Sequence, residues 1–340
     1  MMEELKNCFV KNWGSLCPGV PPPRPRDVLA TKNGDSTEKT VRIYLFTKSP
    51  SGPVCVAKLV RNREDGDVLQ REFDVLTGLH RRFEGGGLLP DSIPKPVGLI
   101  RVREEPVLLL AILPGASLER LLAAGSLLPF GQGKANACLE RLRPWLEFFQ
   151  WCTKGEPISE DMAARKFSLA RIRAAWNGEC GHRIARLGSA CDELGTLRYV
   201  PVACHGRLSP RSVIAAGPGG NQIMDWDGYR ESGHPLDDAL DLVLATATLM
   251  SPWQAKKSAR LFSEPKSFLR NALFSFIFPF RQSAGLSARQ TYLYLLLRAV
   301  RWVDRAAGSR SERGSSLNLL RALVDEEDQI VEQFDGLAAA

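Results

Sequence analysis

A lysine and a glutamate have a spacing that suits an ion pair between a strand and a helix. Lys58 lies in VCVAKLV, and Glu72 follows 14 residues later in LQREFDVL, at the edge of an apolar helical stripe. In phosphoryl transfer such a pair directs the lysine ammonium at nucleotide phosphates and offsets their charge. The alternative is an ordinary, partly exposed ion pair, which contributes about 0–1 kcal/mol.

A second stretch combines a polar loop with an acidic strand end. HGRLSPRS, at 205–212, leads into a predicted hairpin that brings Asp225 of IMDWD back beside the loop, 20 residues after His205. An aspartate in that position can hold Mg²⁺ against nucleotide phosphates. The stretch therefore predicts a place where phosphate and a divalent cation meet.

A third candidate is the loop NGDSTEKT at 33–40. Its residues Gly34, Ser36 and Thr37 offer backbone N–H groups and hydroxyls to phosphate oxygens. The loop has one glycine and matches neither GxGxxG nor a P-loop, so a surface hairpin is the alternative.

The elements that position these residues fall into two parts. The first 115 residues predict a small sheet-rich lobe, because β-branched and aromatic runs alternate with turn sequences. A helix with apolar residues at helical spacing interrupts the strands. The predicted strands span 27–32, 40–49, 54–60, 95–102 and 106–113, and the predicted helix spans 67–82.

The remainder is predicted to be mainly helical. Helical patterns occur near 117–125, 134–152, 160–175 and 182–194, and the segment 236–338 reads as helices with loops at SAG and GSRSERGSS. One further strand pair, 212–216 with 222–226, surrounds the turn GPGGN. We expect an α+β fold with an N-terminal extension and Pro-rich linker at 1–27, an N-lobe at 28–115, and a helical C-lobe at 116–340 that contains the hairpin 203–228.

Composition indicates a folded, soluble protein. Hydrophobic residues make up 44% and charged residues 24% of the 340 positions, which is average for globular chains. The net charge of +7 is spread over interspersed basic and acidic residues, which favours a solvated surface or a cleft for anions over nucleic-acid binding.

Targeting signals are not recognised in the sequence. The start MMEELKNCF is acidic where a secretory signal is basic, and the apolar stretches 271–280 and 291–303 are broken by Pro279, Arg298 and Arg301. The eight cysteines are dispersed without ligand-like spacing, which is typical of reduced, mostly buried thiols. We expect a cytoplasmic protein with no membrane span.

Together these motifs resemble the aminoglycoside phosphotransferase and choline kinase-like family, whose catalytic stretch reads H-G-D-x-x-x-x-N and is followed by a strand with D-W-E or similar. The resemblance runs from about Val28 to Met250 in the family's order and spacing. It implies a two-lobed protein kinase-like fold, a small antiparallel-sheet N-lobe, a large mainly helical C-lobe, and ATP or GTP with Mg²⁺ as cofactors.

The resemblance also assigns roles in the N-lobe. Lys58 resembles the phosphate-binding lysine and Glu72 its helix partner. The segment LLLAILPGASL, at 108–118, resembles the hinge, whose backbone would meet an adenine edge around Ala111 to Leu113.

In the second part of the chain, His205 and Gly206 fit the catalytic loop, Asp225 fits the metal aspartate, and Asp227 replaces the frequent glutamate. GHPLDDALDL resembles the family's G-x-P-x-x-D-L segment, in which Asp238 matches an aspartate that braces the catalytic loop. The alternative role for Asp238 is a carboxylate near a helix N-terminus.

Two positions depart from the family pattern. The catalytic aspartate falls on Arg207, and the metal-holding asparagine falls on Ser212. Arginine stays protonated and only donates hydrogen bonds, so it cannot act as a general base. Losing general-base help costs about 10² to 10⁴ in rate. A serine hydroxyl is also a poorer metal ligand than an amide carbonyl.

These departures leave several functions open. The first is a nucleotide-binding pseudokinase that acts through a protein partner. The second is an active ATP-dependent kinase for a small-molecule or peptide hydroxyl, in which Asp227, Asp225 or a substrate group replaces the base. The third redirects the nucleotide to another transfer, such as nucleotidylation, and the fourth is a kinase-like fold that binds no nucleotide. The acceptor cannot be read from the fold.

Overall fold

The computed structural model describes residues 2–16, 19, 21–33, 40–47, 53–62, 65–84, 89–102, 105–111, 115–127, 129–162, 172, 181–215, 220–250, 268–305 and 310–336. The chain divides into two compact units. Unit 1 contains Met1–Leu118 and Arg211–Tyr229, and unit 2 contains Glu119–Pro210 and Arg230–Ala340. The predicted domain boundaries at 27 and 115 stay predictions.

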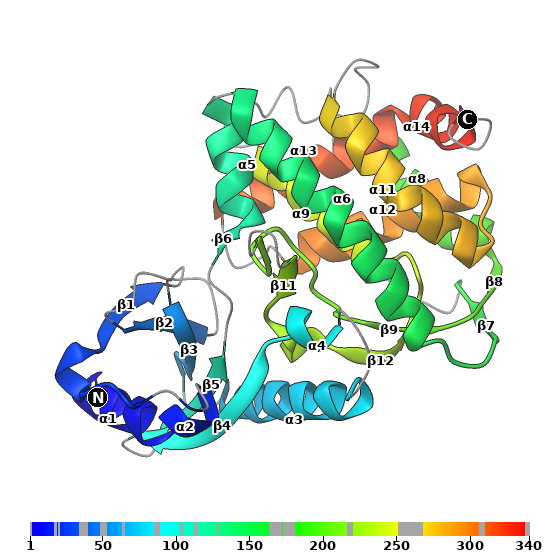
Figure 1. The fold of residues 1–340 in the computed structure, drawn as a ribbon. Coiled ribbons are helices and arrows are strands. Elements are labelled where there is room, and N and C mark those ends of the chain that lie inside the picture. The colour runs from blue at the N-terminus through cyan, green and yellow to red at the C-terminus, as the bar shows by residue number, and fades with distance from the viewer. Residues whose placement is uncertain are drawn as a thin grey trace. The chain divides into compact units, whose positions relative to one another are not determined.

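Unit 1 is built on an antiparallel sheet in the order β1-β2-β3-β5-β4 (Figure 1). The five strands that the sequence predicted are confirmed, with ends that differ by a few residues. The sheet consists of β1 (Leu29–Asn33), β2 (Thr40–Phe46), β3 (Pro53–Val60), β4 (Lys95–Val102) and β5 (Glu105–Ala111).

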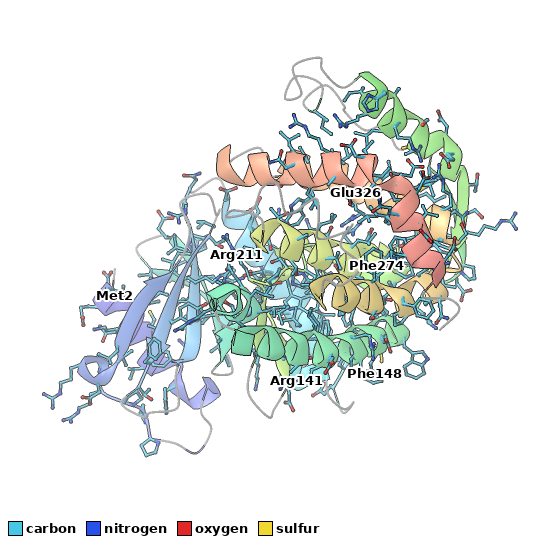
Figure 2. The ribbon with its side chains drawn as sticks, turned by 90° about the horizontal axis from the view of Figure 1, so that it is seen from above. Met2, Arg141, Phe148, Arg211, Phe274 and Glu326 are labelled. Carbon is cyan, nitrogen blue, oxygen red and sulfur yellow. The ribbon has the colours of Figure 1, made fainter. Side chains whose placement is uncertain are left out.

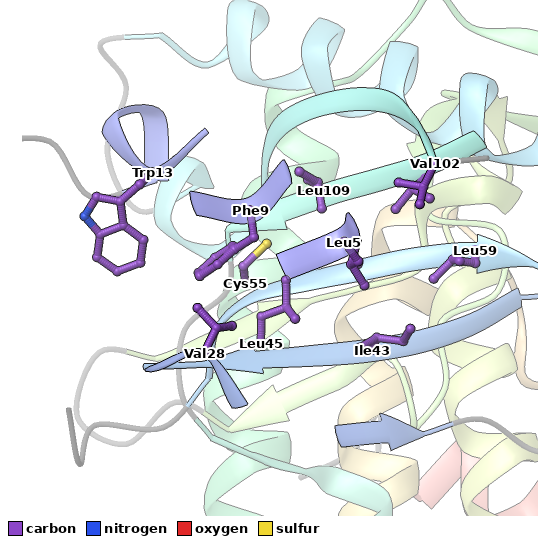
Figure 3. Close-up of a cluster of buried hydrophobic side chains, with 12 residues drawn as sticks. Leu5, Phe9, Trp13, Val28, Ile43, Leu45, Cys55, Leu59, Val102 and Leu109 are labelled. Atoms are coloured by element: carbon purple, nitrogen blue, oxygen red, sulfur yellow. The ribbon is translucent and has the colours of Figure 1, made fainter. Parts of the chain in front are cut away.

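One face of this sheet carries the N-terminal helices α1 (Met2–Lys11) and α2 (Trp13–Leu16). Leu5 and Phe9 lie one helical turn apart and are fully buried in a cluster with Ile43 and Leu45 of β2 (Figure 3). Trp13 meets Phe9 edge to face, with 5.4 Å between ring centroids. The N-terminal helix is therefore part of the core of unit 1. The 3-10 helix η1 (Pro25–Asp27) leads from it into β1.

The other face of the sheet carries α3 (Gly66–Arg82), which confirms the predicted helix. Leu69, Leu76 and Leu79 are buried along one stripe, and Glu72 lies on the same stripe. A carboxylate in an apolar stripe needs a charged or hydrogen-bonding partner. A short helix, α4 (Leu89–Ser92), connects α3 to β4.

The rest of unit 1 is a small sheet of β6 (Ala116–Ser117), β10 (Val213–Ala215) and β11 (Asn221–Ile223). The predicted hairpin is confirmed, but its second strand ends at Ile223 rather than at Trp226. Asp225 has φ 67° and ψ 59°, the left-handed conformation, which is incompatible with a continuing strand. The 3-10 helix η4 (Trp226–Gly228) follows directly.

Unit 2 is mainly helical, as predicted (Figure 1). The apolar stretches that the sequence assigned to core helices lie in α11 (Phe268–Ala284) and α12 (Ala288–Arg305). Phe274 of α11 (Figure 2) packs against Phe334 with 4.8 Å between ring centroids. In the described ranges, no helix reaches the length and hydropathy that a membrane crossing requires. The helices are α5 (Leu118–Leu127), α6 (Pro129–Cys152), α8 (Gly181–Leu194), α9 (Asp237–Met250), α11 (Phe268–Ala284), α12 (Ala288–Arg305), α13 (Arg310–Asp325) and α14 (Glu327–Gly336).

Three expectations for unit 2 were wrong. Residues 160 and 161, where a helix was expected to begin, belong to β7 (Ile158–Asp161), which pairs with β8 (Thr196–Tyr199), and most of the expected helix at 160–175 lies outside the described residues. A further pair, β9 (Val202–Cys204) with β12 (Arg230–Gly233), was not anticipated. The loop expected at 308–316 is helical from the start of α13. In each case pairing or packing with distant segments outweighs the local sequence preference.

The described cysteines agree with the expectation of thiols. Thiols are present at Cys8, Cys55, Cys152, Cys191 and Cys204. Cys55, Cys191 and Cys204 are buried, and the other two are partly buried. Burial raises the pKa of the Cys204 thiol well above its usual value.

Candidate functional site

Lys58 points to the α3 face of the sheet. Strand alternation sends Cys55, Ala57 and Leu59 into the cluster under α1 and leaves Lys58 on the opposite face. Its Nζ lies 2.6 Å from Oε1 and 2.8 Å from Oε2 of Glu72. The lysine side chain is 2% exposed and the glutamate side chain 1% exposed. The pair that the spacing predicted is present, and it is buried rather than partly exposed.

Asp225 joins this pair from the end of β11. Its Oδ1 lies 2.6 Å from Nζ of Lys58. The next residue, Trp226, donates its backbone N–H to Oε1 of Glu72 at 3.1 Å, and its indole N–H to the carbonyl of Ile223 at 2.7 Å. Among the described residues, Asp225 is the one non-glycine residue with a positive φ. This conformation costs about 1–3 kcal/mol and persists only where surrounding contacts enforce it.

Arg42 of β2 is a member of the cluster that the sequence did not reveal. One terminal nitrogen, Nη2, lies 2.7 Å from Oδ2 of Asp225. Arg42 is also the direct cross-strand partner of Lys58 in the β2–β3 ladder. The alternation of buried Ile43 and Leu45 with Arg42 is a signal that would have indicated its face, once the register of this hairpin was known.

Charge and burial act against each other in this cluster. Burial acts to lower the pKa of Lys58, but the charges of Asp225 and Glu72 outweigh it, so the lysine pKa is raised and its ammonium form is favoured. Burial raises the pKa of Glu72 against the opposing effect of Lys58, and the charge of Asp225 raises it further. The cluster thus contains two cationic side chains, Arg42 and Lys58, and two carboxyl groups, Glu72 and Asp225.

Of the other predicted residues of unit 1, some are described by the structure and some lie outside the described ranges. Asp227 is partly exposed within η4, and its charge contributes to the raised pKa of Glu72. The Ser212 side chain is buried, and its carbonyl accepts the N–H of Met224 at 2.7 Å. Ala111 ends β5 opposite Cys55. The remaining predicted residues, Gly34, Ser36, Thr37 and Leu113, lie outside the described residues.

His205, Gly206 and Arg207 of the predicted catalytic loop belong to unit 2. His205 is buried, whereas the Arg207 side chain is exposed. The carboxylate of Asp238 accepts the backbone N–H of His205 at 2.7 Å and that of Gly206 at 2.8 Å. Gly206 has φ 80°, which favours glycine. Asp238 therefore braces the loop, and it does so from the first turn of α9, so both of its predicted roles describe the same position.

A buried ion network that the sequence did not reveal fixes the start of α9. The Asp237 carboxylate accepts hydrogen bonds from the Tyr294 hydroxyl at 2.8 Å and from Nη2 of Arg230 at 2.7 Å. Its Oδ1 also lies 3.1 Å from Nη1 of Arg298. Burial acts to raise the pKa of Asp237, but Arg298 and Arg230 outweigh it and hold that pKa well below its usual range. The carboxylate is thus ionised and holds the helix beside the bracing Asp238.

The predicted magnesium ligands do not form a ready cation site. Both carboxylate oxygens of Asp225 already lie within 2.7 Å of a cationic nitrogen, of Lys58 or of Arg42. Within the part of the chain that the structure describes, no group of three or more His, Cys, Asp or Glu residues could hold a metal. A divalent cation at Asp225 would therefore have to displace Lys58 or Arg42, and the metal-holding role expected of Asp225 and Ser212 stays a prediction.

No protein-family model and no curated protein sequence matches the chain. Among solved structures, a thermostable mutant of aminoglycoside phosphotransferase APH(4)-Ia, in a ternary complex with AMP-PNP and hygromycin B, is similar with TM-score 0.54 and 11% identity, over 95% of this chain and 98% of that chain. Macrolide 2'-phosphotransferase MphH from Brachybacterium faecium gives TM-score 0.46 and 12% identity, over 94% and 97% of the two chains. Plasmodium vivax ethanolamine kinase gives TM-score 0.44 and 11% identity, over 94% and 92%.

At these identities the comparisons concern the fold alone. The similarity to the APH(4)-Ia structure covers nearly the whole length of both chains. It agrees with the resemblance that the motifs around Lys58, Glu72 and Asp225 indicated. The chain has an α+β, kinase-like fold of the kind found in aminoglycoside phosphotransferases.

Proposed function

We propose that unit 1 binds a nucleoside triphosphate, ATP or GTP, and that Lys58 contacts its phosphates. The observation that carries this proposal is the buried Lys58, which is held by Glu72 at 2.6 Å and kept in its ammonium form. A lysine fixed in this way presents a positive charge whose position does not have to be reorganised when an anion arrives. The backbone near Ala111, at the end of β5, is the proposed contact for the base.

The similar aminoglycoside phosphotransferase structure contains AMP-PNP, a nucleotide analogue, and hygromycin B. This supports a nucleotide as the ligand, since the two chains share a fold. It does not identify an acceptor, because sites that differ in side chains occur on one fold.

We further propose that phosphoryl transfer is impaired and that the protein acts through a protein partner. The loop that carries His205 is braced by Asp238, but it presents an exposed Arg207 where a general base is expected. A guanidinium remains protonated and cannot accept the proton of an attacking hydroxyl. Nucleotide binding would then be retained while turnover is slow or absent.

The alternative is an active phosphotransferase that acts on a small-molecule or peptide hydroxyl. Asp227 favours this alternative, because it is a partly exposed carboxylate two residues after Asp225. A carboxylate in this position is able to orient a hydroxyl by hydrogen bonding. Positioning and charge stabilisation supply most of the catalysis in phosphoryl transfer, so an unusual loop is compatible with activity.

Calorimetric titration with ATP and GTP tests the binding proposal. Removing Lys58 alone would leave Glu72 buried without its cation, which typically destabilises by about 3–5 kcal/mol. The double variant Lys58→Met with Glu72→Gln removes both charges and keeps an acceptor for the Trp226 N–H. We expect the wild type to bind and the double variant to lose binding. The control Lys95→Met, at an exposed lysine of the same sheet, should bind normally.

Equal affinity in the wild type and the double variant would exclude Lys58 from the binding site. Turnover is then measured as ATP consumption, with and without candidate acceptors. We expect no consumption above the buffer rate in the wild type. Consumption that disappears in Arg207→Ala or in Asp227→Asn would overturn the pseudokinase proposal and would make the altered residue part of an active transferase.

A further inference from the structure

Arg42 and Lys58 form an unusual pair of facing cations. They are direct cross-strand partners, and like charges in that arrangement repel each other. Their side chains are 13% and 2% exposed, so water screens this repulsion only weakly. The charge of Arg42 indeed acts to lower the pKa of Lys58. Carboxylates that lie between the two cations offset this repulsion.

Asp225 supplies this bridge. Its Oδ1 faces Lys58 at 2.6 Å and its Oδ2 faces Arg42 at 2.7 Å. The left-handed backbone at Asp225 and the hydrogen bonds of Trp226 hold the carboxylate in this orientation. Arg42 is therefore a fixed member of the cluster rather than a surface side chain that happens to lie nearby.

Arg42 changes the net charge of the cluster. With Lys58, Glu72 and Asp225 alone, the cluster would carry one more negative than positive charge when all three groups are ionised. A triphosphate approaching that excess carboxylate would be repelled unless a cation stood between them. Arg42 offsets this excess from within the chain, while the partly exposed Asp227 adds a further negative charge that acts on Glu72. A divalent cation at the same carboxylate would have to displace a mostly buried guanidinium.

The guanidinium is also suited to the phosphate itself. Its planar fork has five N–H donors, and bidentate contacts of arginine with phosphate are common and strong. One guanidinium can therefore serve a carboxylate and a phosphate oxygen at the same time.

We propose that Arg42 takes the place of a divalent cation between Asp225 and the phosphates of the bound nucleotide, so that nucleotide binding does not depend on Mg²⁺. The inference rests on the proposed function, since it concerns how that same cluster receives a triphosphate. It assigns a binding role to a residue of β2 that the motifs around Lys58 and Asp225 do not include.

The test is calorimetric titration of the full chain with ATP, once in EDTA and once in Mg²⁺. We expect the wild type to bind with the same affinity in both buffers. Arg42→Gln should bind roughly 10- to 100-fold more weakly in EDTA, the range of a lost charge-assisted hydrogen bond, and Mg²⁺ should restore part of the loss. Arg42→Lys keeps the positive charge and should remain independent of the metal.

Arg101→Gln is the matched control, because Arg101 is an exposed arginine on β4 of the same sheet. It should behave as the wild type in both buffers, and thermal unfolding establishes that each variant is folded. If Arg42→Gln does not fold, the affinities of the wild type for ATP in EDTA and in Mg²⁺ still decide whether binding depends on the metal. A wild type whose affinity falls tenfold or more in EDTA overturns the role of Arg42 but leaves nucleotide binding intact. A wild type that binds ATP in neither buffer contradicts the proposed function itself.

Discussion

At the scale of single residues, each unit contains a buried cluster of opposite charges. In unit 1, Lys58 meets Glu72 and Asp225, and in unit 2, Asp237 meets Arg230 and Arg298. A buried ion pair often contributes little net stability, because desolvation offsets attraction. Removing one partner is costly, however, since a charge then remains buried without compensation. These clusters therefore fix side-chain positions more than they add stability.

The Asp237 network predicts a sensitivity to acid. The pKa of Asp237 is lowered in the folded state from an ordinary value of 3.8, so its stabilising effect is present above that value and is lost as the pH falls below it. We expect the free energy of unfolding to decrease below about pH 4, and we expect Asp237→Asn to reduce this decrease. Urea unfolding of both proteins at a series of pH values measures the difference.

The acid response of the variant must be compared with that of the wild type, because other groups change the free energy of unfolding in the opposite direction as the pH falls. The pKa of Asp238 is raised by burial, and such a group favours the folded state as the pH falls. Asp192→Asn, at an exposed position of α8, is a suitable control and should leave the acid response unchanged. An acid response of Asp237→Asn equal to that of the wild type would contradict the prediction.

At the scale of elements, α1 is the helix whose role the sequence left open. Because a Pro-rich segment separates it from the first strand, the sequence predicts an N-terminal extension at 1–27. In the structure Leu5 and Phe9 are completely buried against the sheet (Figure 3). The same strands carry Arg42 and Lys58 on their opposite face, so α1 supports the sheet from behind the candidate site.

This arrangement predicts that Phe9→Ala destabilises unit 1. Truncating a buried phenylalanine typically costs about 3–5 kcal/mol, through lost burial and the cavity that remains. Urea unfolding measures the loss, and Asn7→Ala, at an exposed position on the same helix, is the control. A change below about 1 kcal/mol, the size typical of surface substitutions, would show that α1 is not part of the core.

At the scale of the whole molecule, the chain consists of two compact units of different character. Unit 1 is built on antiparallel sheets and contains the Lys58 cluster, whereas unit 2 is mainly helical and contains the braced loop with Arg207. The proposed nucleotide contacts lie in unit 1, and unit 1 is itself made from two separate stretches of the chain. The segment Arg211–Tyr229 joins the N-terminal stretch because Asp225 and Trp226 bind Lys58 and Glu72.

This division predicts where a nucleotide slows hydrogen exchange. Mass-spectrometric exchange with and without ATP should show added protection in peptides from β2, β3 and 220–229, because a bound ligand stabilises the contacts that it makes. The exposed end of α6, where Phe148 stacks on Trp151, is an internal reference and should be unchanged (Figure 2). Protection that omits all three segments of unit 1 would contradict the proposed binding site.

The sequence by itself determined the five strands and the helix of the first sheet, one hairpin and one ion pair. Strand and helix periodicity gave β1 to β5, α3 and the hairpin of β10 and β11, because these signals are local and lie within one segment. The spacing of Lys58 and Glu72 indicated their pair, since a strand and its following helix pack in few ways. The substitution at Arg207 is also visible in the sequence alone, because a residue's protonation chemistry does not require a fold.

Tertiary structure decided the relations between segments that are far apart in the chain. The contact of Arg42 with Asp225 joins residues 183 positions apart, and no local pattern encodes it. The pairs β7–β8 and β9–β12 and the burial of α1 depend in the same way on partners that only the folded chain brings together. Strand pairing and side-chain packing require two segments that fit each other. The sequence of one segment shows that it can form a strand or a helix, but only the folded chain shows which segment it packs against.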